Sequence, residues 1–446
     1  MGALRTAATC LAALACLGLS TTTPAVASPA PTDGDQVDGS TDRREPTPLT
    51  AGTYSDELGA EGRADDVHYF SYERVMADSS VLVTVLGLPD PATDGADGLG
   101  VSIETPDGEA CDDDSVTGDY SSPGRAMSVQ AYAGPEEVGE RDDPCLRADE
   151  LWIAVDRGTS SPTTPLPVTL RVVEEAPVVG STADLPVPPE DAPRLRVPAR
   201  TDASAAEPVE GGLRPGEATE VEAGTSYATE VDEGVQVWFA VPLTWGEGFT
   251  VRVDVPAADA ADVEALGYLG ATVDLDLVEP AGLQFQGEVA EAPDTGTSYG
   301  AEASTIADGT SPVRYLNRFA GYDAAYPGTY GFTLTVAPAP DDREALSVPL
   351  TFVVGRTGEA GGAPQFPEVA GGPGGTAGPT SYDASTPYLV GDGVFAAEVG
   401  LPGESATAAK DAGADGRPWG VALPLAGASL LSVAGGAVLL RRRARA

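Results

Sequence analysis

The chain has 446 residues, and its 69 acidic against 25 basic side chains give a formal net charge of −44 at pH 7. Such a surface repels phosphate backbones, which argues against nucleic-acid binding. It also repels anionic lipid and anionic wall polymers, and it attracts divalent cations and basic partners. A plainer interpretation is that scattered acids keep an exported protein soluble.

The N-terminus has the pattern of an export signal. Arg5 precedes an apolar run over residues 6–20, and Ala25-Val26-Ala27 forms an A-x-A cleavage signal. We expect residues 1–27 to be a removed signal peptide, because the run is too short to span a bilayer. A lipoprotein signal at Cys16 fits poorly. The polar and charged segment 28–48 is expected to be disordered.

Two groups of alternating segments follow, separated by a Pro-rich acidic stretch over residues 176–216 that indicates an extended linker. Period-two alternation predicts half-buried strands. The clearest examples are VLVTVLGL from Val81 and LWIAV from Leu151 in the first group, and FTVRVDV from Phe249 and VPLTFVV from Val348 in the second. No long amphipathic helix interrupts either group, so an all-β fold is expected.

The second group repeats the first. GTYSDEL at Gly52 corresponds to GTSYATEV at Gly224, VHYFSY at Val67 to VQVWFAV at Val235, and VSIETPDG at Val101 to VDLDLVEPAG at Val273. Internal repeats of this size indicate two copies of one domain. The sequence therefore predicts two tandem β-sandwich or jelly-roll domains, over residues 49–175 and 217–356.

The order of these segments resembles a known family. An opening G-T-Y, an aromatic-rich strand, a strand ending in P-D-G or P-A-G, and a late P-G-T-Y-x-F-x-L-x-V (here residues 327–336) occur in bacterial pre-peptidase C-terminal-type sandwich domains. The first copy also resembles segments of actinobacterial surface proteins with a von Willebrand factor A domain, but that domain's D-x-S-x-S metal motif is missing. The resemblance implies an accessory or binding module without a transferable active site.

The C-terminal part is expected to be a stalk and an anchor. Residues 357–418 are rich in Gly and Pro, which indicates a flexible stalk, although the segment from Ser381 could supply a docking strand. Residues 419–440 carry no charge and are long enough to span a bilayer as a helix. Trp419 begins this segment and Leu440 ends it. Arg441, Arg442 and Arg443 open a basic tail, residues 441–446, that is expected in the cytoplasm. The sorting-type pattern LPGES at Leu401 lacks the expected Thr and Gly.

These ends predict a single-pass cell-membrane protein with its bulk outside. The amino-acid usage of the chain is that of a high-GC Gram-positive bacterium. Lys410 is the only lysine.

Cys111 and Cys145 remain after removal of the signal, and in an oxidising exterior they are expected to form a disulfide. Two thiols without a nearby histidine argue against a zinc site.

Two patterns invite a catalytic interpretation that the surrounding sequence does not support. GTSYG around Ser298 matches G-x-S-x-G, but a nucleophile elbow needs a strand before it, a helix after it and a histidine. The only histidine, His68, lies in the other repeat, where its counterpart is Gln236, so its side chain is expected to face solvent.

The best candidate site is a calcium loop. The segment CDDDSVTGDYSSPG places Asp112, Asp113, Asp114 and Asp119 in a loop next to the expected disulfide. Calcium binds carboxylate and carbonyl oxygens at flexible geometry. However, the spacing is not that of an EF-hand, and Asp is frequent in turns.

These patterns are compatible with three functions. The first is a non-catalytic surface protein that binds a protein partner or an envelope component. The second is a calcium-dependent adhesin. The third is a glycan-acting enzyme with a carboxylate pair, which the aromatic content of 6% argues against because sugar clefts need stacking rings.

Overall fold

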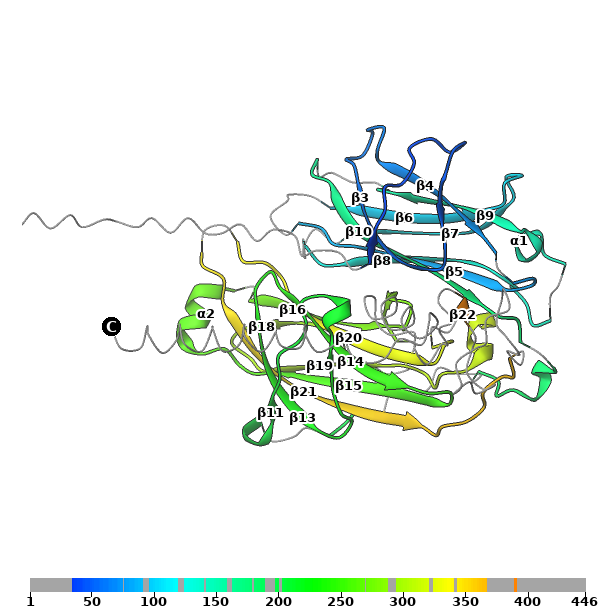
Figure 1. Ribbon diagram of the computed structural model, residues 1–446. Coiled ribbons are helices and arrows are strands. Elements are labelled where there is room, and N and C mark those ends of the chain that lie inside the picture. Colours follow the sequence, from blue (N-terminus) through cyan, green and yellow to red (C-terminus); the bar gives the residue numbers. More distant parts are fainter. Residues whose placement is uncertain are drawn as a thin grey trace, which may run out of the picture.

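The computed structural model describes residues 34–366 and 389–390, with gaps at 75, 91–95, 119–123, 140–141, 159–162, 179, 189–196, 200–202, 269, 288–293, 321–323 and 341–342. The described chain is nearly all β and forms two sandwiches, each of two sheets, with the first sandwich above the second in Figure 1. The all-β sandwich architecture predicted from alternation is therefore confirmed.

The first sandwich contains two sheets that we name after their central strands. The β10 sheet has the order β1 (Asp35–Gln36), β3 (Gly52–Leu58), β10 (Leu166–Glu175), β5 (Ser80–Gly87), β8 (Met127–Ala133). The β9 sheet has the order β2 (Thr47–Leu49), β4 (Val67–Glu73), β9 (Glu150–Asp156), β6 (Gly98–Glu104), β7 (Ala110–Thr117). A short helix, α1 (Pro144–Arg147), precedes β9.

The second sandwich has the same plan. The β21 sheet has the order β11 (Glu207–Pro208), β13 (Ser226–Asp232), β21 (Ser347–Gly358), β15 (Glu247–Val255), β19 (Ser304–Gly309). The β20 sheet has the order β12 (Thr219–Glu220), β14 (Gln236–Leu243), β20 (Gly328–Val336), β16 (Ala271–Val278), β17 (Gln284–Phe285), and β18 (Gly296–Tyr299) also pairs with β16. The helical elements here and in the linker are α2 (Ala260–Leu266), η1 (Thr182–Asp184), η2 (Ala203–Ala205), η3 (Pro215–Glu217) and η4 (Tyr315–Phe319).

The two sandwiches share one strand order, as the sequence repeat predicts. Each copy even begins with two short parallel edge strands: β1 pairs with β3 and β2 with β4, just as β11 pairs with β13 and β12 with β14. The disorder expected for residues 28–48 is therefore wrong from residue 34 onward, because this polar segment completes the edges of both sheets. The linker expected over 176–216 likewise already contains β11.

Alternation in the strands produces two separate cores. In β4, for example, His68, Phe70 and Tyr72 are buried while Val67, Tyr69 and Ser71 face outward. Each fully buried apolar side chain contributes roughly 1.5–3 kcal/mol, and the two sandwich cores share no residue. Phe366 is buried in the second core, so the second sandwich continues past residue 356, where the stalk was expected to begin.

The register corrects one alignment made from the sequence. Thr47 lies opposite Phe70 and Thr219 opposite Phe239, so the structural counterpart of His68 is Val237 and not Gln236. A slip of one residue moves a side chain to the opposite face of a sheet. The prediction that His68 faces solvent is therefore wrong, and this side chain is only 4% exposed.

The docking strand considered within the stalk is present as β22 (Leu389–Val390), which pairs antiparallel with β10 opposite Glu175 and Glu174. No helix within the described residues is both long and apolar enough to cross a membrane. The expected signal peptide (1–27), transmembrane segment (419–440) and basic tail (441–446) lie outside the described residues.

Candidate functional site

The two sandwiches meet along one interface, which we call the seam. The outward side of the β10 sheet packs there against the outward side of the β20 sheet, through a small apolar cluster of Leu86, Ala126, Trp238, Ala240 and Val278. Trp238 is 2% exposed although it belongs to neither sandwich core. In β14, Val237 and Phe239 point into the second core, so the alternation of the strand places Trp238 on the outward side of the sheet.

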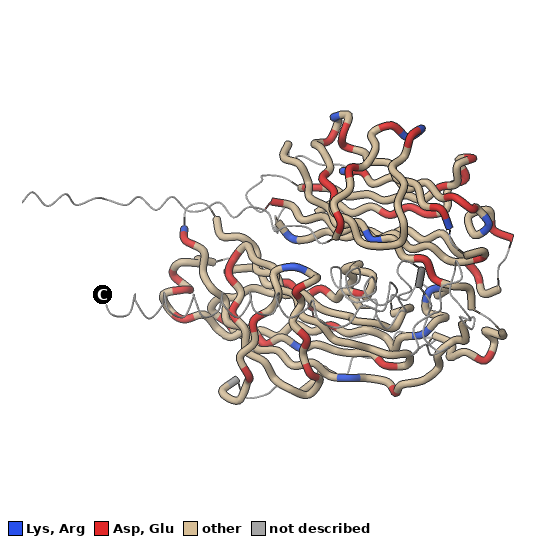
Figure 2. The backbone as a smooth tube through the Cα atoms, in the orientation of Figure 1, with Lys and Arg blue, Asp and Glu red and all other residues tan. Residues whose placement is uncertain are grey.

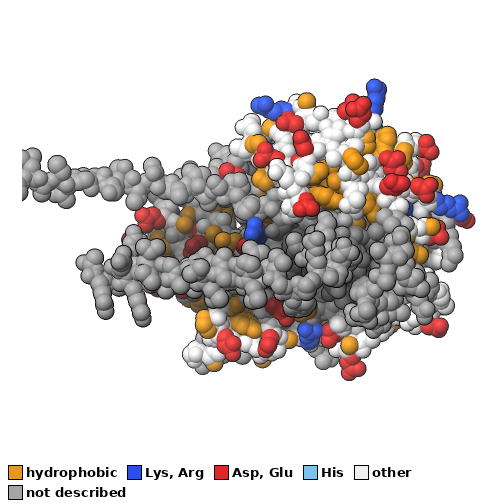
Figure 3. Space-filling model, in the orientation of Figure 1, with side chains coloured by type: hydrophobic (Ala, Val, Ile, Leu, Met, Phe, Trp, Pro, Cys, Tyr) orange, Lys and Arg blue, Asp and Glu red, His pale blue; other side chains and the backbone are white. Residues whose placement is uncertain are grey.

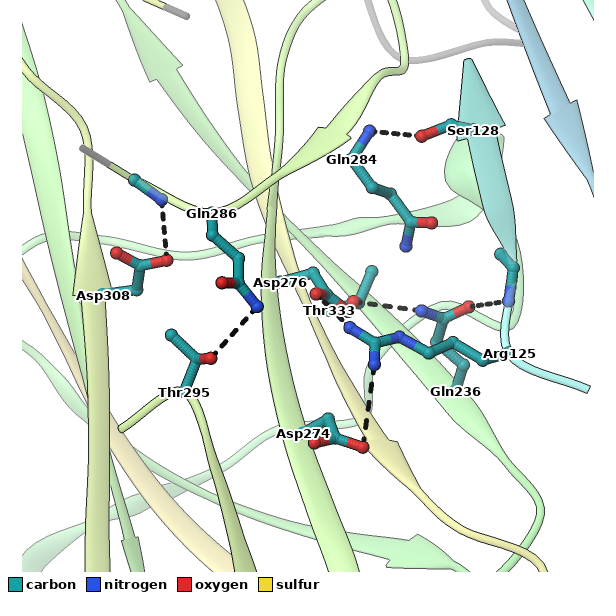
Figure 4. A network of polar contacts seen from close by, with 12 residues as sticks. Arg125, Ser128, Gln236, Asp274, Asp276, Gln284, Gln286, Thr295, Asp308 and Thr333 are labelled. Carbon is teal, nitrogen blue, oxygen red and sulfur yellow. Dashed lines mark hydrogen bonds and ion pairs between the residues drawn. The ribbon is translucent and has the colours of Figure 1, made fainter. Parts of the chain in front are cut away.

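The seam also contains ion pairs and hydrogen bonds, several of which are drawn in Figure 4. Arg125, which precedes β8, donates to Asp276 of β16, and its other nitrogen lies 3.8 Å from Asp274. The Ala126 amide donates to Gln236 Oε1 at 3.3 Å, and Gln236 Nε2 donates to Thr333 at 3.1 Å. One segment of the first sandwich is thus bound directly to strands β14 and β16 of the second, and Gln236 links this contact to Thr333 of β20.

A second group of contacts lies around the residues that follow β16 and begin β17. Gln130 of β8 donates to Glu279, and the Arg171 guanidinium of β10 donates to the Pro280 carbonyl at 3.0 Å. The Gln284 amide donates to Ser128 Oγ at 2.6 Å. Burial lowers the pKa of Arg171 to about 10, with the Glu279 carboxylate opposing that shift. Arg171 remains a cation at neutral pH.

The third contact is a buried ion pair. Arg318 of η4 donates to Glu175 at the end of β10 at 2.6 Å, and the two side chains are 6% and 5% exposed. The guanidinium carbon lies 4.1 Å from the ring centroid of Tyr315 and 4.4 Å from that of Tyr326. Burial alone would lower the pKa of Arg318, but Glu175 and the tyrosines outweigh it and raise that pKa. Cation–π contacts of this kind gain strength when desolvated.

The seam also contains polar atoms that the described protein leaves unsatisfied: Asp276 Oδ2, Gln284 Nε2 and Thr335 Oγ1 are buried without a protein partner. All three lie on the β20 sheet. Burial raises the pKa of Asp276, and Arg125 opposes the shift. Buried groups of this kind are normally satisfied by ordered water, so we expect water between the sandwiches.

Asp308 of β19 lies close to this network. It accepts the amides of Gly287 at 2.9 Å and Gly309 at 2.7 Å, and burial raises its pKa to about 6. Gln286 and Thr295 form the neighbouring contact at 3.2 Å. Because its oxygens already accept two backbone amides, Asp308 has a structural role.

The expected calcium residues have a different local structure from the predicted loop. Asp112, Asp113 and Asp114 lie within strand β7. The Asp112 carboxylate accepts the Tyr132 amide at 2.9 Å and Asp114 accepts the Gln130 amide at 3.1 Å, so both join β7 to β8 across the sandwich edge. Asp119 lies outside the described residues, and the residues that are described hold no group of three or more His, Cys, Asp or Glu side chains suited to a metal. Calcium binding stays a prediction.

The expected disulfide is present: Cys111 of β7 is bonded to Cys145 of α1, with Cα atoms 5.5 Å apart. Ser298 lies within strand β18 opposite Thr272, so it does not occupy a strand-to-helix turn. His68 Nδ1 lies 2.6 Å from Asp56 Oδ2 inside the first sandwich. The described residues therefore do not bring Ser298 and His68 together.

Sequence reasoning missed the arginines of the seam. Arg171 lies in the apolar strand VTLRVV, and an arginine on the outward side of a buried strand is an available signal of a second packing surface. Arg125 and Arg318 lie in loops and short helices, where the sequence offers no such signal.

No model of a protein family matches the chain, and no curated protein matches its sequence. Solved structures that resemble it include the tandem CBM22-1–CBM22-2 domain of Paenibacillus barcinonensis Xyn10C, with 9% identity, a TM-score of 0.18, and coverage of 74% of this chain and 100% of that one. Another is the ANXUR1 extracellular domain from Arabidopsis thaliana, with 9% identity, a TM-score of 0.18, and coverage of 70% and 90%. These TM-scores are too low to support an argument about function.

Proposed function

We propose that this chain is an exported, membrane-anchored, non-catalytic surface protein whose two coupled β-sandwich modules bind a protein partner or an envelope component. The observation that carries the proposal is the seam. Interfaces between domains usually permit relative motion unless they are extensive, whereas this one buries an arginine–carboxylate pair and a tryptophan.

In this proposal the buried charge pairs fix the arrangement of the two sandwiches, a role that buried pairs have in some proteins. Arg318 can meet Glu175, and Arg125 can meet Asp276, in only one relative orientation of the sandwiches. The two modules would therefore present their free faces as one rigid surface, and rigidity lowers the entropic cost of binding.

The non-catalytic assignment rests on where the candidate reactive side chains lie and which partners they bind. His68 is buried against Asp56, and Ser298 lies in a strand of the other sandwich. The carboxylates of the seam are committed to arginine or amide partners. We expect no turnover of glycans or esters.

The extracellular location is supported by the Cys111–Cys145 disulfide, because such bonds persist in oxidising compartments. The export signal over 1–27 and the anchor over 419–440 remain part of the proposal, as does the resemblance to pre-peptidase C-terminal-type modules. Acidic residues are spread along the backbone of both sandwiches in Figure 2, and this distribution favours a basic partner.

The test is affinity purification of the tagged full chain from its native membrane in mild detergent, with mass spectrometry of the proteins recovered. The matched control is the signal peptide joined directly to residues 367–446, which keeps the proposed anchor without the sandwiches. A stoichiometric partner recovered only with the full chain supports the proposal. Equal recovery with the control, or turnover of an envelope glycan by the purified chain, contradicts it.

A further inference from the structure

Because the two sandwiches are copies of one domain, the surface that the second copy uses in the seam has an equivalent surface on the first copy. In the second sandwich the outward side of the β20 sheet is the side that docks on its neighbour. The equivalent sheet of the first sandwich is the β9 sheet, because both have the same strand order. Its outward side has no sandwich packed against it among the described residues.

The positions match residue by residue through the register. Tyr69 forms an isolated bridge with Ser40, and Trp238 forms the same bridge with Gly212, so Tyr69 is the counterpart of the buried seam tryptophan. Ser71 lies opposite Trp152 in the first copy, where Ala240 lies opposite Gly331 in the second.

The free side therefore carries an aromatic pair at its centre. Tyr69 and Trp152 are half-buried, and neither belongs to the first core. They are diagonal neighbours on adjacent strands, since Tyr69 lies opposite Ala154 and Trp152 lies two residues away on the same side. Cross-strand diagonal neighbours are within reach of aromatic side chains. Figure 3 shows hydrophobic side chains gathered among acidic ones on the visible face of this sandwich.

Carboxylates surround the aromatic pair. Glu73, Glu150 and Asp113 are exposed on β4, β9 and β7. Glu104 on β6 lies next to Trp152 in the register and forms an ion pair with Arg43 at 2.6 Å. These carboxylates do not occupy positions equivalent to Asp274 and Asp276 of the seam. The outward sides of the β9 and β20 sheets nevertheless have the same composition, an aromatic centre with acidic side chains at the edge.

We infer that the outward side of the β9 sheet is a second docking surface, and that its partner is a protein β-sheet that presents arginine side chains around an apolar centre. This rests on the proposed binding function and names its surface. Within this chain, the equivalent side of the β20 sheet takes Arg171 from strand β10 and Arg125 from the segment before β8, around an apolar centre that includes Leu86. A second copy of the chain is a poorer occupant, because the net charge of −44 makes two copies repel.

The experiment is site-specific photo-crosslinking in native membranes with the full chain. p-Benzoylphenylalanine replaces Tyr69, and in a matched control it replaces Tyr268, which is 100% exposed on the second sandwich. We expect an adduct to one protein at position 69 and none at position 268. The crosslinked peptide should contain arginine within a strand. Adding Trp152→Ser should weaken the adduct at least about tenfold, because buried tryptophans dominate interface energies.

Higher salt should also reduce the adduct, since the charges at the edge of the surface are exposed. A thermal melt of the Trp152→Ser chain verifies folding, and we expect little change because Trp152 lies outside the core. An adduct to a second copy, to a non-protein component, or equally at both positions overturns the inference. If purification still recovers a partner while position 69 yields no adduct, the binding function stands and this surface is wrong. If neither experiment finds a partner, both proposals fail.

Discussion

Arg318 and Glu175 are 143 residues apart in the sequence, yet Arg318 Nη1 donates to the Glu175 carboxylate at 2.6 Å in the buried seam. The pair joins the two sandwiches between the end of β10 and the last turn of η4, and both side chains are shielded from water. The contact couples the stability of one repeat to the position of the other.

Removing one member of this pair should be costly. Arg318→Met leaves Glu175 buried without its cation, and we expect the free energy of unfolding to fall by roughly 3–5 kcal/mol. Denaturant titration measures this loss. Arg147→Met is the control, because its pair with Asp142 is exposed and should contribute little. The double variant Arg318→Met with Glu175→Leu should recover much of the loss, and a single-variant effect as small as that of the control would contradict the assignment.

Trp238 should hold the sandwiches together. Trp238→Ala removes the largest side chain of the apolar seam cluster, and truncation of a buried tryptophan costs about 3–5 kcal/mol. We expect calorimetry to show one transition for the parent chain and two for the variant. Trp152→Ala is the matched control, because Trp152 is half-buried outside both cores. A single transition in the Trp238 variant would show that the seam does not couple the repeats.

The His68–Asp56 pair should give a pH-dependent stability. The hydrogen bond to Asp56 raises the pKa of His68 above 6.5, against the opposing effect of burial. The pair therefore stabilises the fold fully below pH 6.5, and its contribution is lost as the pH rises through the folded-state pKa. Because His68 is the only histidine, NMR titration of the chain with a non-histidine tag reports this pKa without ambiguity. Asp56→Asn should lower it, and an unchanged value would rule out the pair.

The disulfide between Cys111 and Cys145 closes a loop with a sequence separation of 34 residues. In the chain-entropy account this contributes roughly 3–4 kcal/mol. Reduction should therefore move the denaturant midpoint of the parent chain downward. The Cys111→Ala, Cys145→Ala double variant should unfold at the lower midpoint with or without reductant. A parent chain insensitive to reductant would show that the bond adds no stability.

Variants in strand β7 distinguish a structural role of its aspartates from calcium binding. Asp114→Ala removes an acceptor for the Gln130 amide and should cost about 1 kcal/mol in chelator. Asp113→Ala is the control, because Asp113 is exposed. Melting curves with calcium and with chelator make the comparison. A rise in melting temperature with calcium that both variants abolish would favour the calcium adhesin.

The sequence by itself determined the all-β class, the duplication and the disulfide. Alternation in segments such as VLVTVLGL reports directly which side chains face a core, and two surviving cysteines leave one intramolecular pairing. These are local patterns, or patterns repeated at a fixed distance, and they need no knowledge of how the strands pair.

Only the tertiary structure decided the register, the local structure of β7 and the seam. His68 and Gln236 appear equivalent in an alignment, but strand pairing makes Val237 the counterpart, and one residue of slip reverses the side of the sheet. Three consecutive aspartates suggest a turn, yet β7 is an edge strand paired with β6, and Asp112 and Asp114 accept amides of β8. The seam joins Arg125 to Asp276 and Arg318 to Glu175, and contacts between residues so far apart follow only from the packing of complete sheets.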